Sequence, residues 1–365
     1  LALNTDYLTQ LRQTMRERVA SSTLCDANRF AKTIERAYNF MWEEKNPTSE
    51  QAQNNRNLSE ESIQKAIKLF EENRLDEAAE LAKSLHLSNP ESFRAVDVLA
   101  GILLTQNKLD AAIEAYKKAV QIKPDYSVGF FNLGVASQDL GKAHQAVDFY
   151  SKAIELDPLM KDAFYNRGIS FDSLNQLNEA IADYKAAISL DKAFAEPYNN
   201  AGNCFRKLHK FSESLKYLSK SIEVKPDFAI AHNNLGLTLW MMGQTEEAEN
   251  HLNEAIRLDA DYGNPLANRG NISRRGSEKC LLDFKNAIYK EPTNETFYAN
   301  RCLTAHYFSD ISSDELYEYH KSFGRQFAQP PVELKPAQLQ RHEEKLRIGY
   351  VSPDFQQHSV AYFFE

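Results

Sequence analysis

Residues 127–160 read SVGFFNLGVASQDLGKAHQAVDFYSKAIELDPLM, and residues 161–194 read KDAFYNRGISFDSLNQLNEAIADYKAAISLDKAF. When the two stretches are aligned, glycine, alanine and aromatic residues fall at the same places in both. The glycine of this pattern recurs every 34 residues at Gly134, Gly168, Gly202, Gly236 and Gly270. Pro90, Pro124 and Pro158 keep the same spacing. Several independent columns with one period predict a repeat architecture.

Each repeat is predicted to be a pair of antiparallel helices. In the first quoted stretch we expect helices over 127–140 and 145–156, with the turn at Gly141 and Lys142. Small residues such as Gly134, Ala146 and Ala153 let the two helix axes approach closely. Proline cannot continue a helix, and Pro158 follows the second one. One such pair cannot bury its apolar face alone, so neighbouring pairs are expected to stack.

The repeats are predicted to fill residues 59–308. Full units are expected to begin at Ser59, Phe93, Ser127, Lys161, Ala195, Ala229 and Gly263, with a partial unit from Glu295. The seventh unit is shorter by two residues, which places the deletion near 274–279. This spacing resembles tetratricopeptide (TPR) repeats, and it predicts an all-α helix-turn-helix solenoid, a superhelix. Such a solenoid presents a concave groove to another polypeptide.

Asparagine recurs at one equivalent place in six successive units: Asn132, Asn166, Asn200, Asn234, Asn268 and Asn300. Asparagine is a poor residue for a helix interior, so six in register need an explanation. In one interpretation, buried carboxamides bond neighbouring helices and hold the stack together. In the other, they line the groove and offer a donor and an acceptor to an extended acceptor peptide. The sequence leaves both interpretations open.

Composition limits the classes of partner. The formal net charge of −8 argues against nucleic acid, which usually selects a basic surface. No apolar run approaches the roughly 20 residues of a membrane span. Cys25, Cys204, Cys280 and Cys302 are widely spaced and form no CxxC pair, so neither a metal site nor a disulfide scaffold is predicted. We expect a reducing, cytoplasmic location, and homo-oligomerisation stays open.

After the repeats, from residue 309 onward, the sequence no longer shows the 34-residue pattern. A connecting helix is predicted within 309–328, and the segment 329–344 contains three prolines, which is typical of a linker. Residues 346–355 then read LRIGYVSPDF. The first six have strand character and Ser352-Pro353-Asp354 is typical of a turn, so residues 345–365 are predicted to open an α/β lobe without a GxGxxG motif.

TPR units followed by this motif, with His358 three residues after Phe355, resemble protein O-GlcNAc transferases and their bacterial relatives. The resemblance implies that residues 345–365 begin the N-terminal lobe of a GT-B catalytic domain. It further implies transfer of N-acetylglucosamine from the donor UDP-GlcNAc to Ser or Thr, without metal ion or cofactor. His358 would lie at the active site as a base or a positioning residue. Related members use fucose, so the donor sugar stays open.

Residues 1–44 resemble the two-helix tail that ends the same catalytic domain, with Leu24-Cys25-Asp26 and Met41-Trp42 among the matching residues. A polar linker is expected over 45–58. This order predicts a fragment of a tandem protein, inactive alone because it lacks the donor-binding lobe. A circular permutation is the less favoured account of the same order.

Two functions follow from this sequence. The first is the acceptor-binding region of a protein O-GlcNAc transferase, whose partners are acceptor polypeptides and a nucleotide-sugar donor. The alternative is a stand-alone TPR adaptor or scaffold. The motif at 346–358 favours the first, since an adaptor has no need of it.

Overall fold

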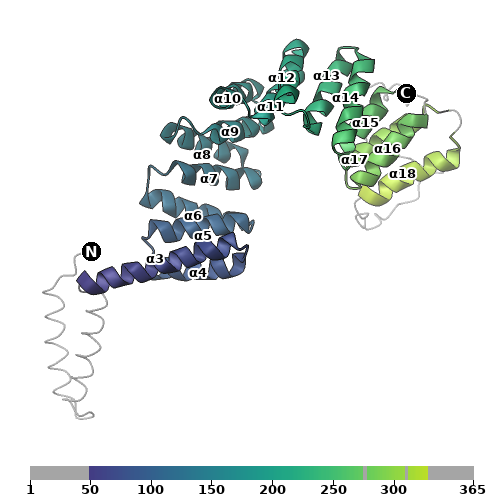
Figure 1. The fold of residues 1–365 in the computed structure, drawn as a ribbon. Coiled ribbons are helices and arrows are strands. Elements are labelled where there is room, and N and C mark those ends of the chain that lie inside the picture. Colours follow the sequence, from purple (N-terminus) through teal and green to yellow (C-terminus); the bar gives the residue numbers. More distant parts are fainter. Residues whose placement is uncertain (1–48, 274–277, 309–310, 328–365) are drawn as a thin grey trace, which may run out of the picture. The chain divides into compact units, whose positions relative to one another are not determined.

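The computed structural model describes residues 49–273, 278–308 and 311–327, which divide between Asp261 and Tyr262 into two compact units. Every regular element in these residues is a helix, from α3 to α18 (Figure 1). The predicted all-α fold is therefore confirmed for this part of the chain. The α/β segment expected at 345–365 and the tail expected at 1–44 lie outside the described residues.

The helices alternate between a first (A) and a second (B) helix of each pair. The A helices of the first unit are α3 (Ser49–Glu71), α5 (Phe93–Thr105), α7 (Ser127–Asp139), α9 (Lys161–Ser173), α11 (Ala195–Lys207) and α13 (Ala229–Met241). Its B helices are α4 (Leu75–Ser88), α6 (Leu109–Ile122), α8 (Ala143–Leu156), α10 (Leu177–Leu190), α12 (Phe211–Val224) and α14 (Thr245–Leu258). The second unit contains the pairs α15 (Gly263–Ile272) with α16 (Glu278–Lys290) and α17 (Glu295–Ala305) with α18 (Ser313–Phe327).

Seven of the eight A helices begin at the residue that the repeat pattern predicts, including α17 after the shortened unit. The exception is α3, which begins at Ser49 and so continues through most of the stretch expected to be a polar linker. After Pro47 this stretch contains no proline or glycine, and helix propagates readily from a packed turn through Gln, Glu, Ala and Arg. The polar composition of this stretch therefore did not prevent it from being helical.

Helix α18 also differs from its expected role as a connector. The ring of Phe327 meets that of Tyr298 edge to face, with centroids 5.1 Å apart. Arg301 on α17 donates from Nη2 to Ser322 Oγ on α18 at 2.7 Å. Helix α18 thus packs on α17 as the B helix of a complete last pair, and the array extends to Phe327.

The glycine column has the role that the sequence predicts. A Cβ added at Gly134 would lie 2.5 Å from Tyr150 Cε1, and one added at Gly168 would lie 2.7 Å from Tyr184 Cε1. Ala146 is fully buried beside this contact. The small residues therefore admit a ring from the B helix directly against the backbone of the A helix.

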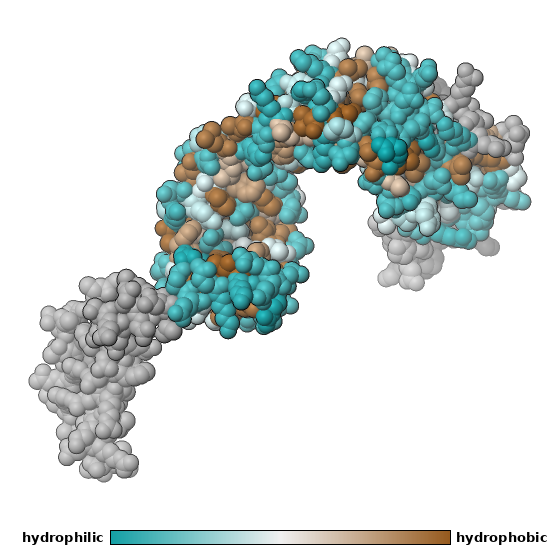
Figure 2. Space-filling view, viewed as in Figure 1, coloured by the Kyte–Doolittle hydropathy of each residue, from teal (hydrophilic) through white to brown (hydrophobic). Residues whose placement is uncertain are grey.

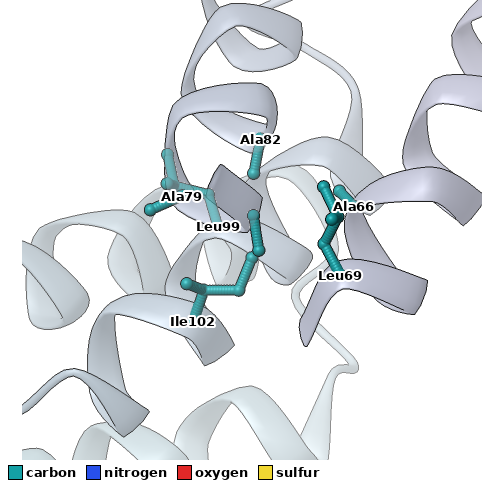
Figure 3. Packing of buried hydrophobic residues seen from close by; sticks show 7 residues of the cluster. Ala66, Leu69, Ala79, Ala82, Leu99 and Ile102 are labelled. Atoms are coloured by element: carbon teal, nitrogen blue, oxygen red, sulfur yellow. The ribbon is translucent and has the colours of Figure 1, made fainter. Parts of the chain in front are cut away.

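The same packing continues between successive pairs. Residues of α3, α4 and α5 meet in one cluster that includes Leu69, Ala82 and Ile102 (Figure 3). Between α12 and α13 the buried hydroxyls of Ser214 and Thr238 lie 3.0 Å apart and bond each other. Each unit is a continuous stack in which helices contact only their near neighbours in the chain, as expected of a solenoid.

Two helix pairs contain a buried ion pair that the sequence analysis did not identify. Arg167 on α9 bonds Asp183 on α10 through two contacts of 2.7 Å, and Asp183 is only 5% exposed. Arg269 on α15 and Asp283 on α16 repeat this arrangement, at 2.9 and 2.6 Å. Each arginine makes a bidentate ion pair with one carboxylate, and these hydrogen bonds offset the free-energy cost of removing both charges from water.

Candidate peptide-binding face

The asparagine column forms a row along the A helices. In the first unit Asn132, Asn166, Asn200 and Asn234 are each the sixth residue of their helix, on α7, α9, α11 and α13. These helices lie side by side, each in contact with the next A helix along the chain. The structure therefore brings the four residues onto one face of residues 49–261. Asn268 and Asn300 hold the same place on α15 and α17 in the second unit.

All six asparagines are half-buried, neither sealed in the core nor fully exposed. A carboxamide at this depth can use one side for the protein and the other for a ligand. The two interpretations of the row, a stacking device and a peptide contact, are thus separated by the bonds that each side chain makes.

Part of the row is bonded from one pair to the next. Asn234 Nδ2 donates to Asn199 Oδ1 at 2.9 Å, and Asn199 Nδ2 donates to Asn200 Oδ1 at 3.0 Å. Asn200 Nδ2 in turn donates to Tyr165 Oη at 3.3 Å. Polar side chains from α13, α11 and α9 are therefore connected, and the orientation of two row members is fixed. Asn199 and Tyr165, which precede the row by one residue in their helices, were not identified from the sequence.

Other row members keep hydrogen-bonding capacity. Asn132 Nδ2 donates to Tyr116 Oη at 2.8 Å, and its Oδ1 has no partner among the described residues. The carboxamide of Asn166 bonds no group in the described part of the chain, although it has the same place and burial as its neighbours. Among the four row members of the first unit, Asn166 is thus the one whose donor and acceptor are both available to a bound polypeptide.

The tyrosines that hold the row stay neutral. Burial raises the pKa of Tyr116, and burial also raises the pKa of Tyr165, against the opposing effect of its bond to Asn200. At the start of the array Tyr126 donates to Asp97 at 2.7 Å, and burial raises the pKa of that carboxyl. The carboxamides and the tyrosine hydroxyls of the row are therefore uncharged and suit the peptide backbone, which is also polar and uncharged.

Apolar side chains flank one end of the row. On α13, Ile230, Asn234, Leu237 and Met241 are spaced to share a helix face. Ile230 is 44% exposed and Met241 42%, and the adjacent Trp240 is 41% exposed. Apolar residues interrupt the hydrophilic surface of the first unit (Figure 2). Because α13 is apolar on nearly all sides, sequence periodicity could not separate these exposed residues from core residues.

Among the described residues no group of three or more His, Cys, Asp or Glu side chains is placed to hold a metal ion. Burial raises the pKa of the Cys204 thiol to about 12, which makes it a poor nucleophile. His358 lies outside the described residues. In the described part of the chain, no helix combines the length and the apolarity needed to span a membrane.

Comparison with known proteins agrees with this architecture. Family profiles described as tetratricopeptide repeat or TPR repeat match residues 102–141, 129–158, 170–208 and 194–261. A solved TPR protein from Parabacteroides merdae superposes with a TM-score of 0.57 at 21% identity, over 68% of this chain and 98% of its own. At that identity the likeness shows the fold alone.

Curated relatives are matched over a shorter stretch. A probable UDP-N-acetylglucosamine–peptide N-acetylglucosaminyltransferase, SPINDLY of Solanum lycopersicum, is 38% identical over 80 residues, or 20% of this chain and 8% of the relative. The SPINDLY protein of Arabidopsis thaliana is 36% identical over 76 residues, with the same shares. The match thus spans less than a tenth of the length of these relatives. The helical array is a solenoid of tetratricopeptide repeats, similar in sequence over a short stretch to the SPINDLY proteins.

Proposed function

We propose that the asparagine row binds acceptor polypeptides in an extended conformation along the A helices. The observation that supports this most strongly is Asn166, a half-buried carboxamide in register with five others and without a hydrogen-bond partner among the described residues. A carboxamide gives one donor and one acceptor to a peptide bond, so the row recognises backbone and not a particular side chain. Such a surface accepts many client sequences.

The neighbouring residues support binding in two ways. The bonds from Asn234 through Asn199 to Asn200 fix side chains before the ligand arrives, which reduces the entropy lost on association. The exposed Ile230 and Met241, which share a helix face with Asn234, offer apolar contact to client side chains.

We further propose that this array is the acceptor-binding region of a protein O-linked N-acetylglucosaminyltransferase, which modifies Ser or Thr with N-acetylglucosamine from UDP-GlcNAc. The sequence similarity to proteins named as such transferases supports this assignment, as does the LRIGYVSPDF motif at 346–355. In this proposal His358 acts at the acceptor hydroxyl, where imidazole is suited to proton transfer near neutral pH.

The binding proposal is tested with Asn166→Ala. Loss of one hydrogen-bonding side chain from the peptide contact is expected to weaken affinity about two- to tenfold. Affinity for a panel of labelled Ser- and Thr-containing peptides would be measured by fluorescence anisotropy. Asn107→Gly is the matched control, because it removes a carboxamide from a turn with φ of 57° outside the row. Equal affinity of Asn166→Ala and the parent for every peptide that binds would refute a peptide-contacting row.

The transferase proposal is tested on the protein as its gene encodes it. His358→Ala is expected to lose sugar transfer from UDP-GlcNAc, whereas Asn166→Ala should lose transfer to long acceptor polypeptides and retain it on a short peptide. Peptide binding without any sugar transfer would instead identify an adaptor or scaffold.

A further inference from the structure

A cavity of about 740 Å³ opens on the B-helix side of the first unit, between α10 and α12. It lies apart from the asparagine row, and Tyr198 of the intervening α11 contributes to its floor. The volume is within the range of known ligand sites, roughly 300 to 1,000 Å³. No step of the proposed acceptor binding uses this cavity.

The floor is apolar and aromatic. Ile188, Leu215 and Tyr217 line it with Tyr198, whose ring centroid is 6.3 Å from that of Tyr217. Tyr217 also packs on Phe205 at 5.1 Å, which holds its ring in place. The Tyr198 hydroxyl has no hydrogen-bond partner among the described residues. The floor therefore suits an apolar or aromatic side chain, and the Tyr198 hydroxyl can bond a polar group of the ligand.

The rim is cationic. Lys185, Lys192, Lys216 and Lys220 line the cavity with a single carboxylate, Glu223. Lys220 Nζ bonds Glu223 at 2.6 Å, whereas the other three lysines have no carboxylate partner in the described chain. These three charges stand together in a protein with a formal net charge of −8. The local excess of positive charge therefore selects an anionic ligand.

The lysines are spread along the cavity. Lys185 lies on α10, whereas Lys192 lies in the turn that follows this helix. Four residues separate Lys216 from Lys220 on the opposite wall, roughly 6 Å. The lining contains no arginine, so no guanidinium fork concentrates the positive charge at one point of this cavity. An extended polypeptide places alternate side chains roughly 7 Å apart, which matches separate carboxylates to separate lysines.

We propose that this cavity is a second docking site, which binds an acidic segment of a partner protein with an aromatic residue as its anchor. The anchor would lie on Tyr198 and Tyr217, and the flanking carboxylates would meet Lys185, Lys192 and Lys216. This site is independent of the asparagine row, so one partner could occupy both faces or two partners could bind together.

The test uses a labelled peptide, Gly-Glu-Asp-Phe-Asp-Glu-Gly, and the whole chain. Lys185→Glu combined with Lys216→Glu is expected to weaken its binding about tenfold or more. Raising salt from about 50 mM to about 0.5 M should weaken binding in the parent and have little effect in the variant. Replacing the peptide phenylalanine with serine should also weaken binding if the aromatic floor is used.

Two controls separate this site from general electrostatics and from the row. Lys83→Glu combined with Lys108→Glu makes the same charge change at exposed positions on α4 and at the start of α6, and it should leave binding unchanged. Asn166→Ala should also leave it unchanged. Equal losses in both lysine double variants would overturn the proposal, and so would no binding of the peptide. Displacement of the bound peptide by a nucleoside diphosphate at the same lysines would instead indicate a small-anion site.

Discussion

Where the eighth residue of an A helix is glycine, the packing of that helix on its B helix depends on it, because the site has no room for even one methyl group. At Gly168 a Cβ would meet the ring of Tyr184, which is only 1% exposed and has no room to move. Gly101 is also inside an A helix, yet its nearest foreign atom, Tyr116 Oη, would lie 3.6 Å from a Cβ. Substitution by alanine is therefore expected to have opposite effects on the free energy of unfolding at these two helical glycines.

We predict that Gly168→Ala lowers the free energy of unfolding by about 2 kcal/mol, because overpacking forces the ring and backbone apart. Gly101→Ala should raise it by up to about 1 kcal/mol, since alanine is the better helix former and space is available. Chemical denaturation followed by circular dichroism measures both. If Gly168→Ala were more stable than the parent, the two helices would accommodate the extra methyl group without loss of stability, and the prediction would be wrong.

The buried pair Arg167–Asp183 supports a second residue-scale prediction. Removing one partner leaves a charge without its counterion in the core, so Asp183→Ala is expected to cost about 3 kcal/mol or more. In the preceding pair the equivalent places hold Leu133 and Phe149. Arg167→Leu combined with Asp183→Phe copies that solution and should recover most of the loss. A double variant as unstable as Asp183→Ala would contradict the assignment of the cost to an unpaired charge.

At the scale of the element, the pair α13–α14 contains two imidazoles in contact, His232 and His251, whose rings are tilted by 36°. His232 Nε2 lies 3.2 Å from the carbonyl oxygen of Pro226, which can only accept, so this nitrogen donates. His232 Nδ1 lies 3.1 Å from His251 Nδ1 and accepts from it. Burial, and then the charge of His232, hold the pKa of His251 below its ordinary value, against a weaker opposing effect of Glu247 and Glu254.

Stability of this pair is expected to depend on pH. Because the folded state lowers the pKa of His251, it binds fewer protons than the unfolded chain below about pH 6.5. Stability is fully present above that pH and is lost as the pH falls, so the thermal midpoint should drop between about pH 7.5 and about pH 5.5. His251→Gln, which can still donate to His232, should flatten this dependence. His144→Gln, at an exposed site on α8, should leave the parental slope; the same slope in all three proteins would exclude His251 as its source.

The elements also show what the sequence could and could not predict. Seven A-helix starts were predicted at the correct residue, because a 34-residue period gives the register once several columns agree. The start of α3 and the packing of α18 were not, since neither segment carries the repeat columns that predicted the others. On the candidate face the row itself was visible as a column. Asn199, Tyr165 and the exposed Trp240 were not, because their roles depend on contacts between pairs and on exposure, which periodicity does not contain.

At the scale of the molecule, stability is expected to be distributed over neighbouring pairs. Residues 49–261 form one compact unit with its own core, so this segment produced alone should fold and melt cooperatively. It contains Asn132, Asn166, Asn200 and Asn234 and should retain peptide binding. A shorter segment, residues 127–261, should also be helical but melt at lower temperature, because it has fewer stacking interfaces. Circular dichroism melts compare the two; a disordered 49–261 segment would show that it depends on the rest of the chain.

The location of the buried ion pairs also has a consequence for how this array changes by recombination. Arg167 and Asp183 are encoded within one repeat, as are Arg269 and Asp283. Gain or loss of a whole repeat therefore carries both charges together and does not leave one stranded in the core. The bond between Asn199 and Asn234 crosses a repeat boundary instead, so shuffling repeats would break it. The core thus tolerates changes in repeat number, whereas the bonds that Asn199 and Tyr165 make to the row form only when the repeats follow one another in this order.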